Sequence, residues 1–297
     1  MGNKIRKRCP LCFGSGYKVV YPSTYNPKIH LNAAIFSARR LPDKIHGTII
    51  KCNKCGLVRT REVVNPSTLN SLYSRSVFTY QNLTDNLRLS YGQVIKDASR
   101  FTKKNDFLEI GCGNGFILAE AQKIGFKRVF GVEPSRDAVN RAKPGIKSRI
   151  KVDILKRNLF KENSFDLIAA FQVFDHIPDP NKFLKICRSL LKPGGLLVLM
   201  NHDVNALSAK LLGEKSPIFD IEHTFLYSQQ TISKMIDLNG LQKVKVYGPK
   251  SIFSIHYFIR MLPLPETVKR LVEKSSLQIF DKNIKFNPGN LAIYAKK

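Results

Sequence analysis

The sequence predicts an α/β fold: a doubly wound parallel sheet that follows a small cysteine-rich unit and a helical segment. From residue 106 onward, short apolar segments alternate with segments of helical periodicity. The first apolar segment runs directly into three glycines, at positions 111, 113 and 115. Near the N-terminus, two C-x-x-C pairs are separated by 39 residues. Strand–helix alternation with short turns is typical of a parallel sheet covered on both faces.

Residues 1–64 are expected to form a zinc-ribbon-like domain. Two C-x-x-C pairs suit tetrahedral coordination of one structural Zn²⁺, which would replace a core that so small a unit cannot build. The predicted ligands are Cys9, Cys12, Cys52 and Cys55. Two disulfides or a thioredoxin-like redox pair are the alternatives, and they need an oxidising compartment or an adjacent strand–helix unit. The spacer between the pairs is expected to be an extended hairpin or a loop.

Residues 65–105 are expected to form a helical linker or lid. Pro66 suits the first turn of a helix, and apolar residues recur at intervals of three and four after it. The aromatic residues of this segment either cover the mouth of a substrate site or form the packed face of a helix. They are Tyr73, Phe78, Tyr80 and Tyr91.

Residues 106–297 supply the large α/β domain. A strand at 107–111 leads into a helix that ends at Gly125, and a strand at 128–133 leads into a helix capped by Ser135. Further strands are expected at 149–155, within 164–177 and at 196–200, with a helix from residue 179 that a Pro-Gly-Gly sequence ends. In such sheets, ligands bind at the carboxyl ends of the strands.

The glycine turn, residues 111–115, is predicted to hold an adenosine-containing ligand, because its glycines let the backbone approach a ligand at a helix start. The dinucleotide pattern Gly-x-Gly-x-x-Gly is incomplete, since Phe116 stands at its last glycine position. Glu133 ends the second strand, where a carboxylate can accept hydrogen bonds from both ribose hydroxyls. Asp153 ends the third strand, within reach of an adenine amino group. These residues predict an adenosine without a pyrophosphate.

Four segments in this order and spacing resemble class I S-adenosylmethionine-dependent methyltransferases: LEIGCGNG, GVEPS, FDLIAAFQVFDHIPDP and LLKPGGLLVL. The resemblance covers residues 106–297 and implies a seven-stranded Rossmann-like sheet, with NLAIYAKK as its closing strand. The front of the chain, with CNKCGLV, Asn65-Pro66, Leu72-Tyr73 and Tyr80, is similar to zinc-ribbon methyltransferases that are linked to sugar and glycan modification.

The resemblance implies roles for individual residues. Glu109 would lie near the methionine end of the cofactor, and Phe171 and Gln172 beside its sulfonium. The full set of implied cofactor-binding residues is Glu109, Gly111, Cys112, Gly113, Gly115, Glu133, Asp153, Ile154, Phe171 and Gln172. Family members commonly carry Glu-His before an Asp-Pro sequence. This chain has Asp175-His176 there, which leaves the role of Asp175 open.

Three histidines are candidates for a general base, because histidine titrates near pH 7. His176 follows the fourth strand and His202 the fifth, so both are expected to face the cleft. His223 lies in IEHTFLYS, which resembles a loop that closes over the active site of the family. A structural role is the alternative for each of them.

The net charge of +27 predicts attraction to polyanions, with a solvated basic surface that has no partner as the alternative. Neither a signal peptide nor a spanning segment is recognised, so a cytoplasmic location is expected. Residues 249–283 are expected to form a lid or insert, with peripheral contact to an anionic membrane as the alternative. Basic residues are set among its apolar ones: Arg260, Lys269, Arg270 and Lys274.

Three functions therefore stay open. The first is methyl transfer from S-adenosylmethionine to a sugar nucleotide, glycan or related small molecule. The second is methylation of RNA, which the charge and the zinc unit favour. The third is a non-catalytic, zinc-containing nucleic-acid-binding protein, against which the intact Gly113, Glu133 and Asp153 argue. The sequence specifies neither the acceptor atom nor the oligomeric state.

Overall fold

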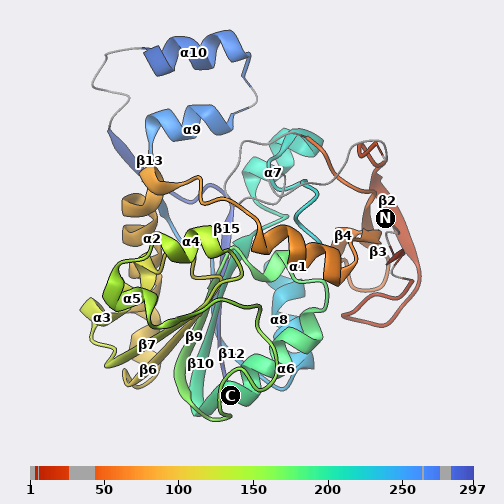
Figure 1. Cartoon of the computed structure of the whole chain (residues 1–297). Helices are drawn as coiled ribbons and strands as arrows, with labels where there is room; N and C mark the ends of the chain where they lie inside the picture. The colour runs from red at the N-terminus through yellow and green to blue at the C-terminus, as the bar shows by residue number, and fades with distance from the viewer. Residues whose placement is uncertain (1–3, 6, 27–43, 263, 275–281) are drawn as a thin grey trace.

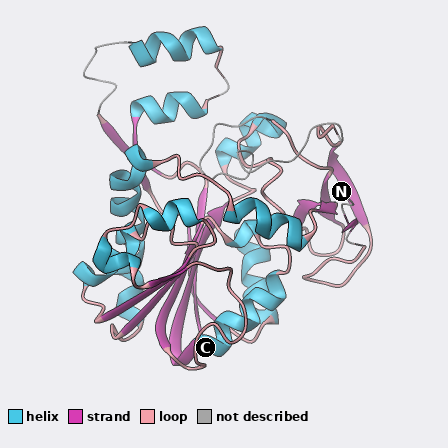
Figure 2. Cartoon of the chain, viewed as in Figure 1, coloured by secondary structure: helices cyan, strands magenta, loops and turns pink. Residues whose placement is uncertain are grey.

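The computed structural model describes residues 4–5, 7–26, 44–262, 264–274 and 282–297. A central sheet with helices on both faces forms the main body, and a smaller sheet carries the N-terminal segment on one side of it (Figure 1). Helices α9 and α10 project from one end (Figure 2). The predicted α/β class with an N-terminal cysteine unit is confirmed.

Seven strands form the central sheet, in the order β12-β15-β10-β9-β6-β7-β8. Strands β8, β7, β6, β9 and β10 pair in parallel, whereas β15 runs antiparallel to both β10 and β12. The prediction of a seven-stranded, doubly wound sheet is therefore confirmed. The strands are β6 Asp106–Ile110, β7 Arg128–Val132, β8 Ile150–Lys151, β9 Phe165–Phe171, β10 Leu191–His202, β12 Gln242–Tyr247 and β15 Asn290–Lys296.

Helices cover both faces of the sheet, because successive residues of a strand point to opposite sides. Phe107 packs into a core cluster with α2 and α3, whereas the next residue, Leu108, packs with α6 and α8. The helices are α1 Pro66–Ser74, α2 Thr84–Ala98, α3 Phe116–Ile124, α4 Arg136–Asn140, α5 Pro144–Lys147, α6 Pro180–Leu190, α7 Leu207–Leu212, α8 Gln229–Leu238, α9 Ile255–Met261 and α10 Glu266–Lys274.

Local sequence sets several element ends as predicted. Ser135 caps α4 by accepting a hydrogen bond from the N–H of Ala138, and Gly125 ends α3 in the left-handed conformation. The third strand, β8, is shorter than predicted: it spans Ile150–Lys151, and in the described sheet it pairs with β7, with Val132 opposite Lys151. Helix α6 ends at Leu190, so the Pro-Gly-Gly sequence lies in an irregular start of β10 rather than in the helix.

The N-terminal module, residues 4–64, is built around a sheet of order β11-β4-β3-β2. Strands β2 (Tyr17–Tyr21) and β3 (Ile49–Cys52) pair antiparallel as a hairpin, and residues 27–43 between them lie outside the described part. Strand β4 (Val58–Thr60) continues the sheet, and β11 (Phe225–Leu226) is added to it from the main body. Two short strands, β1 (Lys4–Ile5) and β5 (Glu62–Val63), pair separately.

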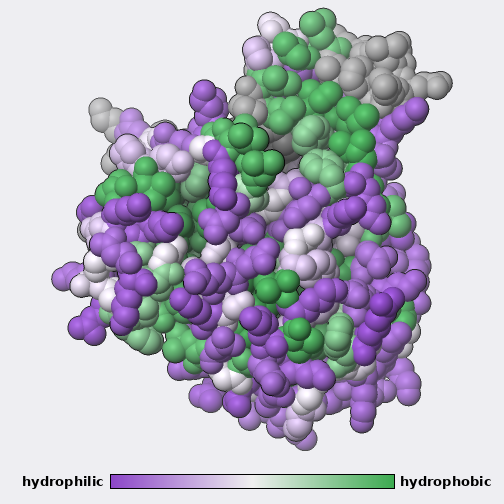
Figure 3. Space-filling model, turned by 180° about the vertical axis from the view of Figure 1, so that it is seen from behind, coloured by the Kyte–Doolittle hydropathy of each residue, from purple (hydrophilic) through white to green (hydrophobic). Residues whose placement is uncertain are grey.

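The projecting part, between β13 (Ser251–Ser254) and β14 (Asn283–Phe286), contains α9 and α10. Apolar residues gather on this end of the molecule, whereas much of the body below it is hydrophilic (Figure 3). Leu271 on α10 is 71% exposed. Residues 263 and 275–281 of the expected lid lie outside the described residues. Among the described helices, none has the length and apolar character needed to cross a bilayer.

Candidate active site

A cavity of about 570 Å³ lies at the carboxyl ends of β6, β7, β9 and β10. Residues from the strand ends, the linker, the segment 217–223 and α9 line it. Nine of the ten predicted cofactor-binding residues are among them, as are the three predicted histidines. The tenth, Gly115, instead precedes α3 with a φ of +71° and packs against Ile146. The nine are Glu109, Gly111, Cys112, Gly113, Glu133, Asp153, Ile154, Phe171 and Gln172.

The glycine turn has no room for side chains. Gly111 and Gly113 have φ angles of +74° and +55°, in the region that favours glycine. A Cβ on Gly111 would lie 2.5 Å from Cγ2 of Val173, and one on Gly113 would lie 2.6 Å from the hydroxyl oxygen of Tyr80. The turn thus packs directly under the aromatic part of the linker.

The carboxylate of Glu133 is fixed beside this turn. Its Oε2 accepts a hydrogen bond from the N–H of Gly113 at 2.9 Å, and its Oε1 accepts one from the N–H of Ser135 at 2.8 Å. Burial raises the pKa of Glu133, and these two N–H groups act against that rise. Each carboxylate oxygen can accept a further hydrogen bond. Glu133 is therefore an oriented acceptor at the cavity wall.

Glu109 lies deeper in the cavity, where burial and the charge of Glu133 raise its pKa well above the usual range. Its Oε2 is buried and accepts no hydrogen bond from a described residue. At the opposite side, Asp153 accepts a hydrogen bond from the N–H of Ile154 and pairs with Lys156 at 2.6 Å. Acidic groups therefore border both ends of the space beside Glu133.

The aromatic residues of the linker close one side of the cavity. The ring of Tyr91 stacks on that of Phe171, with centroids 4.4 Å apart, and the ring centroids of Phe78 and Tyr80 are 4.1 Å apart. The segment that carries Phe78 is tied to the start of α4, because the N–H of Phe78 donates to Asp137 at 2.9 Å. All four predicted aromatic residues, Tyr73 included, line the cavity.

The histidine cluster consists of Asp175, His176, His202 and His223. The ring centroids of His176 and His223 are 4.8 Å apart, and those of His202 and His223 are 5.2 Å apart. The structure thus brings together three histidines that are distant in the sequence. Asp175 is 1% exposed, and its two oxygens lie 3.7 Å from Nε2 of His176 and 3.9 Å from Nε2 of His223.

Burial shapes the charges of this cluster. It lowers the pKa of His176 well below the usual value, and the nearby His223 and His202 lower it further. Burial also raises the pKa of Asp175, whereas His223 and nearby backbone N–H groups act in the opposite direction. Nδ1 of His176 lies 3.0 Å from the hydroxyl of Tyr73, and Nδ1 of His223 lies 2.9 Å from the carbonyl oxygen of Ile218.

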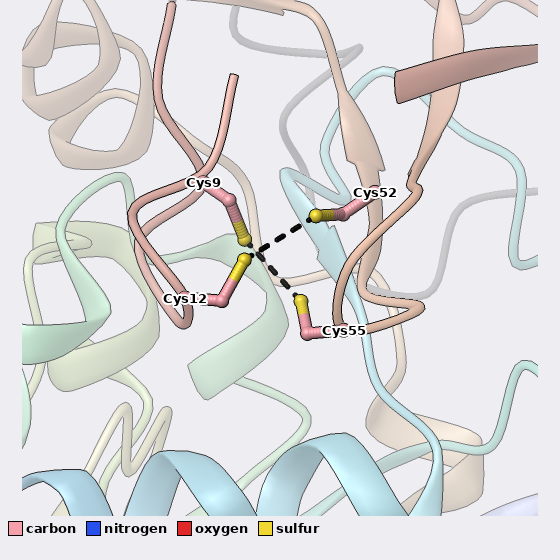
Figure 4. Close-up of side chains that lie close together, drawn as sticks. All are labelled: Cys9, Cys12, Cys52 and Cys55. Atoms are coloured by element: carbon pink, nitrogen blue, oxygen red, sulfur yellow. Dashed lines mark hydrogen bonds between the residues drawn. The ribbon is translucent and has the colours of Figure 1, made fainter. Parts of the chain in front are cut away.

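The four predicted metal ligands meet at one point (Figure 4). The Sγ atoms of Cys9 and Cys55 are 3.5 Å apart, those of Cys12 and Cys52 are 3.4 Å apart, and all four lie within 4.8 Å of one another. Four thiolates around a tetrahedral zinc ion are separated by about 3.8 Å, given Zn–S bonds of about 2.3 Å. All four cysteines are free thiols, so the arrangement is a four-cysteine group able to hold a metal ion.

The module that carries these cysteines also holds the segment that carries His223. Strand β11 begins two residues after His223 and pairs with β4, with Phe225 opposite Arg59. The N–H of Thr60 donates to the carbonyl oxygen of Thr224 at 3.0 Å. The cysteine group and the histidine cluster are thus connected through one short sheet.

Comparison with known proteins places this architecture in a family. Residues 84–246, more than half of the chain, match the family described as "Methyltransferase domain". The chain belongs to this methyltransferase family. Its sheet and glycine turn are those of the class I, S-adenosylmethionine-dependent type, as predicted. The match begins at the first residue of α2, which packs against α3 in the core.

The methyltransferase domain is similar to several named proteins. Ubiquinone biosynthesis O-methyltransferase from Bradyrhizobium diazoefficiens is 31% identical over 112 residues, which cover 36% of this chain and 44% of that protein. The corresponding protein from Vibrio atlanticus is 26% identical over 54% of this chain and 72% of its own length. The chain thus spans less than half of the first of these relatives.

Solved structures give weaker likenesses. The YcgJ protein from Bacillus subtilis has a TM-score of 0.49 and 17% identity, over 69% of this chain and 97% of its own. A methyltransferase from Thermotoga maritima, described as a possible histamine N-methyltransferase, has a TM-score of 0.49 and 19% identity, over 73% of this chain and 94% of its own.

Some features of the candidate site escaped the sequence prediction. Asp175 was noted only as a departure from a motif, yet it is the buried centre of the histidine cluster. The contact of Tyr73 with His176 joins residues 103 positions apart, so no local pattern signals it. Asp220, Glu222 and Tyr257 also line the cavity, from segments without a recognised motif.

Proposed function

We propose that the protein transfers a methyl group from S-adenosylmethionine to an oxygen atom of a small molecule, with sugar nucleotides and glycans as the favoured class. The observation that carries this proposal is Glu133, oriented by two backbone N–H groups beside a glycine turn at the wall of the cavity. The names of the relatives, which are O-methyltransferases, support an oxygen acceptor.

The residues of the cavity fit the cofactor. Glu133 would accept hydrogen bonds from the ribose hydroxyls, and Asp153 with Ile154 would border the adenine. The buried Oε2 of Glu109 suits the ammonium group at the methionine end, because that oxygen has no hydrogen-bond donor among the described residues. Backbone at Gly111 and Gly113 lies close to this space, where a Cβ would meet other side chains.

S-adenosylmethionine, when bound, supplies a methyl group on a positively charged sulfur. The sulfur is the leaving group and keeps the electron pair of the C–S bond that breaks. Phe171 and Gln172 lie at the end of β9, where they would border that sulfur. The chain must align an acceptor oxygen and remove its proton as the new C–O bond forms. His176, His202 and His223 are the candidates to accept that proton, and all three line the cavity.

We assign a structural Zn²⁺ to Cys9, Cys12, Cys52 and Cys55. The four-cysteine set and its distances fit tetrahedral zinc. The ion would hold the N-terminal module together, and that module positions the segment with His223 through β11. Residues 1–64 would then be a zinc-ribbon-like domain, 65–105 a linker and lid, and 106–297 the methyltransferase domain.

The segment 249–283 is proposed as a further lid, because Tyr257 of α9 lines the cavity. Contact with an anionic membrane is the competing role, favoured by the exposed Leu271 beside Arg270. Sedimentation with anionic liposomes decides between them: protein that stays in the supernatant supports the lid.

Transfer of labelled methyl groups tests the proposed function. The protein is incubated with S-adenosylmethionine labelled in its methyl group and with fractionated sugar nucleotides, small phenols and RNA. We expect label in a small-molecule fraction, because the named relatives are O-methyltransferases of ubiquinone biosynthesis and aromatic residues of the linker line one side of the cavity. Label in RNA would replace the small-molecule proposal, and no label in any fraction while the cofactor binds would refute both.

A further inference from the structure

The carboxylate of Asp175 is buried in a setting that its hydrogen bonds do not explain. The residue is 1% exposed, and neither oxygen has a hydrogen-bond partner of ordinary geometry among the described residues, although the backbone N–H groups of Asp175, His176 and His202 lie near enough to oppose the rise in its pKa that burial causes. Removing a carboxylate from water costs several kcal/mol unless a partner compensates. The groups in front of it are the imidazoles of His176 and His223, whose Nε2 atoms lie 3.7 and 3.9 Å away.

The orientation of His223 makes this arrangement more unusual. Its Nδ1 lies 2.9 Å from the carbonyl oxygen of Ile218. A carbonyl can only accept, so Nδ1 carries the hydrogen, and Nε2 of the neutral ring directs a lone pair toward Asp175. The ring of His176 also turns Nε2 toward Asp175, with Nδ1 at the hydroxyl of Tyr73; because a hydroxyl can donate or accept, this contact allows either tautomer of His176.

When both rings are neutral and carry their hydrogen on Nδ1, two imidazole lone pairs and a carboxylate face one region, an arrangement that a bound cation stabilises. Metal-ligating histidines commonly donate their other ring N–H to a carbonyl or another oxygen, as both histidines are placed to do here. The three ligand atoms lie within 4.8 Å of one another, and metal–ligand distances of about 2.0–2.2 Å would bring them to about 3.0–3.5 Å, so side-chain rotations would have to shorten the separations by up to about 1.5 Å. A shared proton fits less well, because the N–O distances exceed hydrogen-bond length.

We propose that Asp175, His176 and His223 bind a divalent transition-metal ion at the acceptor end of the cavity. One carboxylate oxygen and two imidazole nitrogens suit ions such as Fe²⁺, Co²⁺ or Zn²⁺ better than Mg²⁺ or Ca²⁺. The ligands come from the 3₁₀ turn Phe174–His176 and from the segment before β11, so this site is distinct from the four-cysteine group.

The ion defines the class of acceptor, a point that rests on the proposed function. Three protein ligands leave positions open toward the cavity, where an acceptor with two neighbouring oxygens can bind both. A bound cation lowers the pKa of a coordinated hydroxyl, so that oxygen loses its proton more readily before it takes the methyl group; with the rings of His176 and His223 bound to the ion, His202 remains the candidate to accept that proton. The acceptor is therefore a catechol, a vicinal diol or a hydroxyketone rather than an isolated alcohol.

Titration with Co²⁺ alone tests the site in the full-length protein. Thiolate-bound cobalt gives intense sulfur-to-metal charge-transfer bands, whereas a nitrogen and oxygen site gives only weaker visible bands. We expect one Co²⁺ per chain of the second type, with affinity at least about tenfold lower in Asp175→Asn and His223→Gln. The matched control is His202→Gln, which removes a neighbouring imidazole outside the ligand set and is expected to change the affinity much less than either of the other two variants does.

Three outcomes overturn parts of the inference separately. Absence of the second type of spectrum, or equal affinity in wild type and Asp175→Asn, removes the metal site. Catechol is expected to shift the visible bands and resorcinol, whose oxygens are not adjacent, is not; equal responses remove the acceptor class. S-adenosylmethionine binding is measured on the same samples by calorimetry. If the wild-type protein does not bind S-adenosylmethionine, the proposed function is refuted. If it binds S-adenosylmethionine but shows no cobalt site, only the metal inference is refuted.

Discussion

Replacing Gly113 by alanine tests the role of the glycine turn in cofactor binding. Comparison with a control glycine distinguishes the effect of close packing from the effect of the left-handed backbone conformation. A Cβ at Gly113 would lie 2.6 Å from the hydroxyl oxygen of Tyr80, so that oxygen must move by about 0.8 Å to reach a contact of 3.4 Å. The left-handed φ of +55° costs a further ~1–2 kcal/mol for any residue with a Cβ. The shift also disturbs the hydrogen bond from Gly113 to Glu133, and a bond to a charged group is worth about 1.5–3 kcal/mol.

Gly194 offers a matched control. It has a similar φ of +74°, it is exposed at the start of β10, and a Cβ there would meet nothing within 4 Å. Both variants should melt a few degrees below wild type, because each carries the same backbone cost of ~1–2 kcal/mol. Only Gly113→Ala should weaken S-adenosylmethionine binding, by about tenfold or more in calorimetry, from the disturbed bond to Glu133. Equal affinities in the two variants would refute the role of this turn.

Two further variants test the metal unit and the ion pairs. Cys52→Ser should reduce bound zinc from about one ion per chain to nearly none by elemental analysis, because three thiolates hold zinc far less well than four. The control is Cys187→Ser, which changes a buried cysteine outside the four-cysteine group and should leave the zinc content unchanged. Zinc retained in Cys52→Ser would contradict the assignment. Asp106 is buried, and its carboxylate pairs with Arg128 at 2.6 Å and with Lys192 at 2.7 Å. Burial alone would raise the pKa of Asp106, but the two cationic partners outweigh burial and hold this pKa below its usual value. The stability it contributes is therefore present above about pH 4 and lost as pH falls through the folded-state value, so Asp106→Asn should cost about 1–3 kcal/mol in urea unfolding at pH 7 and less at pH 3.5. A cost that is the same at both pH values would contradict this reasoning.

The sequence predicts features that depend on neighbouring residues. The glycine turn, the carboxylate at the end of the second strand and the Ser135 cap are each encoded within a few positions, and the structure has all of them. The cysteine quartet was predictable because C-x-x-C spacing fixes each pair locally, and tetrahedral geometry then requires the pairs to meet.

Long-range pairings were not predictable in this way. Strand β11 joins the N-terminal sheet about 165 residues away from β4, and only that pairing shows why His223 is held near Asp175. The burial of Asp175 likewise depends on segments far apart in the chain, so the sequence showed Asp175 beside His176 but not its position near His223.

The central claim is that Glu133 binds the ribose of S-adenosylmethionine, and calorimetric titration of the cofactor tests it most directly. Glu133→Gln keeps the size of the side chain but removes its charge, so losing charge-assisted hydrogen bonds should weaken binding by about 1.5–3 kcal/mol, or roughly 10- to 150-fold in Kd. The exposed Glu162→Gln, which lies outside the cavity, should bind as the wild type does. Equal Kd values for Glu133→Gln and wild type, or no binding by the wild type, would contradict the account.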